Sequence, residues 1–366
     1  MDFGLSFVQA QVQESTRRML EDRLSTQQIR EAEESADGFP RPIWDEGIQL
    51  GWPGMSLPEA FGGGGCSLLD MCVLVEEVGR GGATLPLVVS SGVAATLLEH
   101  SPQSELRDWV LSEIAAGKIV CPALIDEHGR NEWDEVRLPI SADGQLSGKK
   151  ILVPFASVAD ELLVTAVTPD GDTTIVVVDP NTEGVSITRH HTKVGLPLFA
   201  VEFNDVLVAA EIHRGEGAQT ALDAGLQTGS LLATAEAVGT SEALIKMSAE
   251  YVTVRKAFGQ PIGAFQAVAH PCADMRINTD TVRLLVHEAA WLIGTGQDAS
   301  EEVASTKALA NEFFERLAND AFRVHGAIGY SNEYDLQLYT RRLQGFCRTM
   351  GETQESLERA AVALGI

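Results

Sequence analysis

The sequence predicts an α+β protein made of three successive domains. Apolar residues recur with helical spacing over residues 1–118 and again over residues 213–366. Residues 119–212 instead hold short runs of β-branched residues, separated by turn-forming pairs such as Asp143-Gly144 and Asp170-Gly171. We therefore expect an N-terminal helical domain (1–118), a middle antiparallel β domain (119–212) and a C-terminal four-helix bundle (213–366).

The N-terminal domain is expected to hold helices on either side of an irregular loop. Phe7, Val12 and Leu20 mark the apolar face of the first helix. Further helices are expected over residues 25–34, 68–78 and 106–116. The segment 51–65 between them is too rich in Gly and Pro to continue a helix.

The β-branched runs of the middle domain predict strands near residues 119–125, 151–154, 162–166, 174–178, 185–189 and 200–208. Helical spacing then returns, and helices are expected over residues 217–255, 264–294, 300–324 and 333–346, with a last one from Thr353. Gly239 lies in the apolar stripe of the first of these helices. A residue without a side chain permits close helix packing at that point.

The end of this long helix carries a cation and an aromatic ring next to a turn. Gly259 and Pro261 are expected to end the helix and reverse the chain, so that Arg255 and Phe258 lie together beside the turn. A guanidinium group binds a pyrophosphate well because it can donate two parallel hydrogen bonds. An aromatic ring can cover an adenine or ribose face. The turn therefore indicates a nucleotide site.

The segment RKAFGQPIGAFQ, residues 255–266, resembles the Arg-x-x-Phe-Gly-x-x-Ile-x-x-Phe-Gln segment of the acyl-CoA dehydrogenase family. In that family the segment reaches across a dimer interface to the ADP part of the neighbour's FAD. The resemblance implies that Arg255, Phe258 and Gln266 bind FAD. It also implies an acyl-CoA substrate, an electron-transfer acceptor, and an oligomer interface on the exposed faces of the C-terminal helices.

Two further segments resemble the same family. The loop LPEAFGG, residues 57–63, borders the substrate cavity in the family, although here it could be purely structural. The segment HGAIGY, residues 325–330, resembles a family segment that leads into the flavin region. The resemblance implies that Arg323, His325 and Gly326 approach a phosphate or ribose. His325 considered alone could equally be a turn histidine with a local hydrogen bond.

The family removes the substrate α-proton with a glutamate from one of two places. One is a position just before the last helix, which corresponds here to Met350. The other lies on the first long C-terminal helix, 26 residues before the arginine that binds FAD, and corresponds to Gly229. Neither residue can act as a base, so the resemblance leaves the catalytic base unassigned.

Glu236 is the best remaining candidate for the base. It lies in the apolar stretch LLATAEAVG, seven residues after Gly229 and so on nearly the same helix face. A carboxylate in such surroundings is expected to have a raised pKa, as a base near neutral pH requires. A structural salt bridge and a hydrogen bond between helices are the alternatives. The rise of about 10 Å over two helical turns argues against the base.

The middle domain also departs from the family pattern. Residues 121–127 replace a Thr-Glu-Pro-x-Ala-Gly-Ser segment, and residues 152–154 replace a Trp-x-Thr that contacts the flavin. In this respect the chain resembles subunits of heteromeric acyl-CoA dehydrogenases that degrade sterol and bile-acid side chains in bacteria. The resemblance implies a tetramer, with itself or with a second chain of this family. The chain is then either catalytic or a structural, FAD-sharing subunit whose partner holds the base; oxidation of a non-thioester is a third possibility.

Composition limits the remaining function classes. The formal net charge of −25 argues against binding to nucleic acid or to an anionic membrane surface, and a CoA site would need local Lys and Arg. The five cysteines lack metal-ligand spacing, so no metal site is expected. The sequence has neither the pattern of a signal peptide nor an apolar run of membrane length. We expect a cytoplasmic protein with reduced cysteines.

Overall fold

The computed structural model describes residues 4–127, 136–208 and 210–366. Its N-terminal part consists of helices with the bounds α1 Phe7–Arg23, α2 Thr26–Glu34, α3 Arg41–Gln49, η1 Glu59–Phe61, α4 Leu68–Arg80, η2 Leu87–Ala94, α5 Ala95–Glu99 and α6 Glu105–Ala115. Ser6, Ser25 and Ser67 each begin a helix with a reciprocal capping box. Residues 1–3 of the N-terminal segment lie outside the described residues.

The segment from Leu87 to Glu99 was not expected to form regular structure. Residues 87–94 form the π-helix η2, in which every side chain is buried. A fully buried helix has no polar face and therefore no amphipathic period to detect in the sequence. Single π-helical turns are often found at functional sites, and η2 lines the cavity described below.

The middle part contains two four-stranded sheets. One has the strand order β1-β4-β5-β8 and the other β2-β3-β7-β6. The bounds are β1 Val120–Ala123, β2 Ile125–Asp126, β3 Gln145–Pro154, β4 Glu161–Val167, β5 Thr173–Val178, β6 Val185–Arg189, β7 Leu198–Leu207 and β8 Ala210–Arg214. Strands β1 and β4 run parallel, so the prediction of an antiparallel domain was wrong for this pair. Strand β8 crosses the boundary expected after residue 212.

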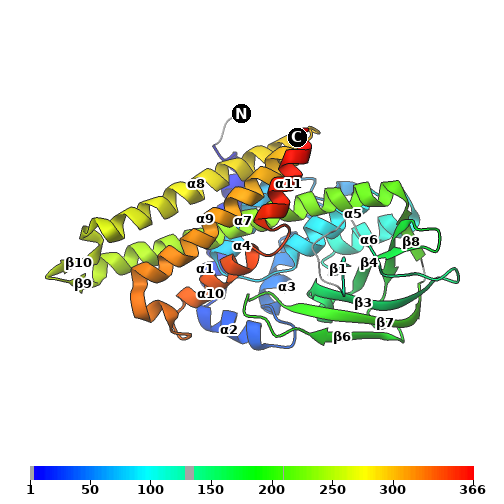
Figure 1. Cartoon of the computed structure of the whole chain (residues 1–366), viewed down its shortest axis with the longest axis horizontal. Helices are drawn as coiled ribbons and strands as arrows, with labels where there is room; N and C mark the ends of the chain where they lie inside the picture. Colours follow the sequence, from blue (N-terminus) through cyan, green and yellow to red (C-terminus); the bar gives the residue numbers. More distant parts are fainter. Residues whose placement is uncertain (1–3, 128–135, 209) are drawn as a thin grey trace.

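The C-terminal part returns to helices, as predicted. They are α7 Glu216–Val254, α8 Gln266–Gly294, α9 Ser300–His325, α10 Leu336–Phe346 and α11 Thr353–Ala363, with the short helices η4 Ile262–Ala264 and η5 Gly326–Tyr330. Strands β9 (Lys256–Ala257) and β10 (Gln260–Pro261) form a hairpin between α7 and α8. In Figure 1 this hairpin lies at one end of the long axis, and the two sheets lie at the other end.

Helix α7 is 39 residues long and packs on α4, α8, α9, α10 and η2. Its contact with α4 is very close. A Cβ added to Gly239 would lie 1.7 Å from the carbonyl oxygen of Glu76, and one added to Gly79 would lie 2.0 Å from that of Glu236. The close packing expected at Gly239 is therefore present, and it fixes the position of the α7 segment that carries Glu236.

Ion pairs add to this contact on the other side of α4. Arg283 from α8 binds Glu76 of α4 at 3.0 Å and also pairs with Glu242 of α7. Burial raises the pKa of Glu76 to about 7 although Arg283 opposes the shift. Among the described residues, no helix is both long and apolar enough to cross a membrane.

Candidate functional site

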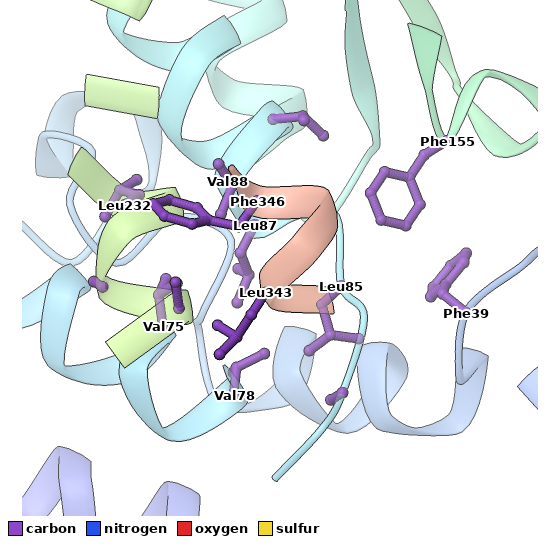
Figure 2. Close-up of a cluster of buried hydrophobic side chains, with 14 of the residues drawn as sticks. Phe39, Val75, Val78, Leu85, Leu87, Val88, Phe155, Leu232, Leu343 and Phe346 are labelled. Carbon is purple, nitrogen blue, oxygen red and sulfur yellow. The ribbon is translucent and has the colours of Figure 1, made fainter. Parts of the chain in front are cut away.

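A cavity of about 100 Å³, here called the central cavity, lies where η2, α7, α10 and the end of β3 meet. Its walls are mostly apolar, and Figure 2 shows several of the side chains that line it: Leu85, Val88, Phe155, Leu343 and Phe346. A mostly apolar enclosure with few polar groups is the usual form of a small-molecule site.

In the part of the chain that the structure describes, Glu236 from α7 is the only carboxylate that lines the central cavity. It is half-buried because it faces this space, and protein surrounds it on its other sides. Loss of hydration raises its pKa to about 7, while the nearby Arg342 opposes the shift. Among the described residues, its carboxylate has no hydrogen bond or ion pair within 4.0 Å. The salt bridge and the interhelical hydrogen bond considered as alternatives are thus not seen.

The two residues at the family's usual base positions lie next to each other. A Cβ added to Gly229 would lie 3.4 Å from Sδ of Met350. Met350 has a positive φ of 56° and also lines the central cavity. The side chain of Met350 therefore lies next to Gly229, and Glu236 lies further along the cavity that Met350 lines.

Lys307 of α9 holds the segment that carries Met350. The lysine is 1 % exposed, and its Nζ donates to Oδ1 of Asn311 at 2.5 Å and to the carbonyl oxygen of Phe346 at 3.2 Å. Asn311 in turn donates to the carbonyl oxygen of Gly351 at 3.1 Å. Burial lowers the pKa of Lys307 to about 7. The segment 346–351 is therefore fixed on both sides of Met350.

A second cavity of about 620 Å³, the lateral cavity, lies on the other side of Met350 between α7, α9 and α11. Its lining includes more acidic than basic side chains: Asp223, Asp298, Glu355 and Glu358 against Lys307 and Arg359. An acidic excess is unfavourable for the phosphates of CoA.

A groove of about 1000 Å³ between α2, the β6–β7 connection and α10 carries the opposite charge. Its basic residues are Arg30, Arg189, Lys193 and Arg341, with His190 and His191, against Glu33, Glu34 and Glu333. The groove shares Gly195 and Leu196 with the central cavity. Because the chain as a whole is acidic, a CoA site was expected to need a local excess of Lys and Arg, and this groove has such an excess.

The β9–β10 hairpin exposes the residues expected to bind a nucleotide. Phe258 is 95 % exposed at its tip, with a φ of 54°, and its ring meets that of Phe265 edge-on at 6.1 Å. Arg255 and Gln266 are also exposed. Within the described residues the Arg255 side chain forms no ion pair. An exposed ring and an unpaired guanidinium on one tip fit an adenine nucleotide supplied from outside the subunit.

The three candidate residues around His325 differ in their exposure to solvent. The Arg323 side chain is 73 % exposed and pairs with Asp320 at 2.9 Å. His325 is buried and stacks on Tyr251, and its Nδ1 lies 2.9 Å from the carbonyl oxygen of Ala321. Burial lowers the pKa of the His325 imidazole. Gly326 has open space at its Cβ position, so backbone there is accessible to a ligand.

The hairpin and the central cavity are far apart on one helix. Arg255 follows Glu236 by 19 residues, which corresponds to about 28 Å at 1.5 Å per residue. A subunit therefore cannot apply its own hairpin to the same end of a ligand that Glu236 contacts. This separation fits a site that combines elements of two chains.

Comparison with known families agrees with this arrangement. Residues 8–118 match the acyl-CoA dehydrogenase N-terminal domain, and residues 215–363 match the acyl-CoA dehydrogenase C-terminal domain. The chain belongs to the acyl-CoA dehydrogenase family. As a member of this family it is a flavoprotein oxidoreductase that acts on CH–CH bonds and uses FAD.

Relatives of this acyl-CoA dehydrogenase align over almost its whole length. Benzylmalonyl-CoA dehydrogenase from Aromatoleum aromaticum is 29 % identical over 98 % of both chains. The ChsE4-ChsE5 complex from Mycobacterium tuberculosis contains a chain of 27 % identity that superposes with a TM-score of 0.89, over 100 % of this chain and 99 % of the other. A variant of the Tcur3481-Tcur3483 steroid acyl-CoA dehydrogenase gives 29 % identity and a TM-score of 0.88 over 98 % of both chains.

Sequence reasoning missed the basic residue that lines the central cavity of this acyl-CoA dehydrogenase. Arg342 of α10 lines the central cavity, and its side chain is only 8 % exposed. The pair Arg341-Arg342 was visible in the sequence, but adjacent arginines usually indicate a solvated helix face. Only the packing of α10 on α7 and α9 shows that the second of them is buried and lines the cavity.

Proposed function

We propose that this chain dehydrogenates an acyl-CoA thioester between its α- and β-carbons as one subunit of a heterotetramer with a second chain of the same family. In this proposal Glu236 removes the α-proton. The observation that carries it is the Glu236 carboxylate, which has no hydrogen-bond or ion-pair partner among the described residues and lies in a mostly apolar cavity. Burial there raises its pKa to about 7, which suits a general base.

The residues proposed for proton transfer and those proposed to bind FAD lie at two different ends of the molecule. Around the central cavity, Leu85, Val88 and Phe155 exclude water, so that the Glu236 carboxylate meets the substrate without a hydration shell. FAD, when bound, accepts the hydride from the β-carbon. At the other end, Arg255, Phe258 and Gln266 hold the nucleotide part of the FAD that serves the neighbouring chain.

The roles of the remaining candidate residues follow from their exposure. Arg323 is accessible enough to reach a phosphate, and Gly326 allows backbone to approach the nucleotide. His325 supports this turn from within, because it is buried and bonded to its own helix. All five cysteines are free, which suits the reducing cytoplasm in which we place the protein, together with an electron-transfer acceptor for the reduced flavin.

The proposed substrate is a CoA ester of a steroid side chain. The support is similarity over almost the full length to the Tcur3481-Tcur3483 steroid acyl-CoA dehydrogenase and to the two-chain ChsE4-ChsE5 complex. Each of these two assemblies is made of two different chains, which also supports the heterotetramer.

A second candidate function is a FAD-sharing subunit whose partner carries out the proton transfer. Two observations favour it. Both usual base positions, Gly229 and Met350, lack a carboxylate. The lateral cavity next to Met350 also has an acidic lining that opposes CoA binding. In this case the hairpin would be the main contribution of the chain to catalysis.

A substitution in the purified two-chain complex separates the two candidates. Glu236→Gln keeps the shape of the side chain but cannot accept the α-proton. If Glu236 is the base, the rate of flavin reduction by steroid acyl-CoA falls about 10²–10⁴-fold, as for loss of a general base. Glu250→Gln on an exposed turn of the same helix is the control and should leave the rate unchanged. An undiminished rate in Glu236→Gln assigns the base to the partner.

A further inference from the structure

The guanidinium group of Arg342 lies at the wall of the central cavity, and only part of its hydrogen-bond donors are used. Its Nη2 donates to Oγ1 of Thr84 at 2.5 Å, and Thr84 in turn donates to the carbonyl oxygen of Gly195. Within the described residues, Nε and Nη1 of Arg342 are buried and have no hydrogen-bond partner. Leaving buried donors unsatisfied is costly, so such groups normally face a ligand or an ordered water.

The nearest carboxylate does not satisfy this arginine. Oε1 of Glu33 lies 3.9 Å from Nη2 of Arg342, and this oxygen is itself buried without a hydrogen bond. The other oxygen of Glu33 binds Arg341 at 2.9 Å, so the carboxylate is drawn toward the neighbouring arginine. Arg342 therefore keeps donors available at the cavity although an acid is close by.

A count of charges shows what kind of group these donors suit. Arg341 and Arg342 contribute two positive charges, and Glu33 and Glu236 contribute two negative charges when Glu236 is ionised. The cluster is then neutral. A ligand carboxylate would add an uncompensated charge next to two acids, whereas a neutral oxygen would accept a hydrogen bond without changing the balance.

We propose that Arg342, supported by Thr84, is a specificity-determining residue that binds a neutral acceptor oxygen, a ketone or hydroxyl, on the acyl group of the substrate. This inference rests on the proposed function, because it assumes that the acyl group enters the central cavity of this chain. It selects oxygenated acyl groups over unsubstituted fatty acyl chains and over chains that end in a carboxylate. The rest of the cavity wall is mostly apolar and cannot make this distinction.

The test measures binding of unreactive CoA thioethers to the FAD-loaded complex with its partner chain by calorimetry. Three probes are compared: the octyl thioether of CoA, the same chain with a ketone near its far end, and the same chain with a terminal carboxylate. We expect the ketone probe to bind about tenfold or more tightly than the other two, as for a hydrogen bond to a charged group. In Arg342→Met this preference disappears, while the affinity for the octyl probe is unchanged.

Arg348→Met is the matched control, because this arginine pairs with Glu352 at 3.6 Å and does not line the central cavity. It should retain the preference for the ketone. Arg342→Lys keeps a cation in the cavity wall and should retain part of the preference for the ketone. It therefore still tests the inference if the methionine variant does not fold. Equal affinity of the unaltered complex for the octyl and ketone probes overturns the inference, as does a preference that survives in a folded Arg342→Met. Failure of every probe to bind would instead contradict the proposed function.

Discussion

Gly229 faces Met350, which lines the central cavity, so that a Cβ on the glycine would lie 3.4 Å from the methionine sulfur. The family's two alternative base positions are therefore neighbours in space although they are 121 residues apart in sequence. Met350 lines the central cavity, whereas a Cβ on Gly229 would also lie 2.4 Å from Cγ2 of Val93.

A base could accordingly be restored at residue 350. We expect Met350→Glu, combined with Glu236→Gln, to raise the rate of flavin reduction by straight-chain acyl-CoA about tenfold or more above that of Glu236→Gln alone. Stopped-flow bleaching of the flavin in the two-chain complex measures this rate. Met350→Gln in the same background is the control, since it has the same shape and no basic group. Equal rates for the Glu and Gln variants would show that the substrate does not approach this position.

The rate should also depend on pH through Glu236. Because burial raises the pKa of this carboxyl to about 7, it is increasingly protonated, and so unable to accept a proton, as the pH falls below 7. We expect kcat/KM to decrease about tenfold for each pH unit below 7 and to level off above 8. A profile that stays flat between pH 5 and pH 8 would contradict the assignment.

Retention of flavin should depend on the exposed hairpin. Arg255→Ala removes the unpaired guanidinium, and Phe258→Ala removes a ring that is 95 % exposed and therefore contributes little to folding. We expect each to reduce bound FAD in the intact oligomer by half or more without lowering the melting temperature. Lys256→Ala, between them on the same hairpin, is the control. Full flavin occupancy in both variants, measured by absorbance after gel filtration, would contradict the proposed nucleotide site.

The crossing of α4 and α7 should tolerate no added methyl group. Gly239→Ala would bring Cβ to 1.7 Å from the Glu76 carbonyl oxygen, so the helices would have to separate. We expect a loss of about 1–3 kcal/mol in the free energy of unfolding, as for overpacked cores. Gly294→Ala at the end of α8, where a Cβ meets nothing, is the control and should be neutral or slightly stabilising. Urea denaturation of both variants tests this comparison.

The sequence predicted the fold well wherever an element had one polar face. The helix ends at Glu34, Arg80 and Val254 were predicted to within a few residues, because caps, glycines and amphipathic periods marked them. The π-helix η2 was missed because it is buried on all sides. The parallel pairing of β1 with β4 was also missed, since strand direction depends on chain topology and leaves no local pattern.

The candidate site was predictable only in part for a related reason. Glu236 attracted attention because a charged residue interrupts an apolar stretch. Arg342 did not, because the sequence around it is polar and its burial depends on the contacts of α10 with α7 and α9. A residue whose role arises from three elements distant in sequence cannot be identified from its neighbours along the chain.

The length of α7 has a genetic consequence. In the proposed function its two ends serve different reaction centres, so loss of the hairpin in one gene product would stop catalysis at the centre in the other. The mutation would then lie in the gene of one chain, while the active site that stops working would lie in the other chain. In a cell that expresses altered and normal copies together, the altered chains would inactivate the normal partner chains with which they assemble. A mutation in one gene copy would therefore be dominant.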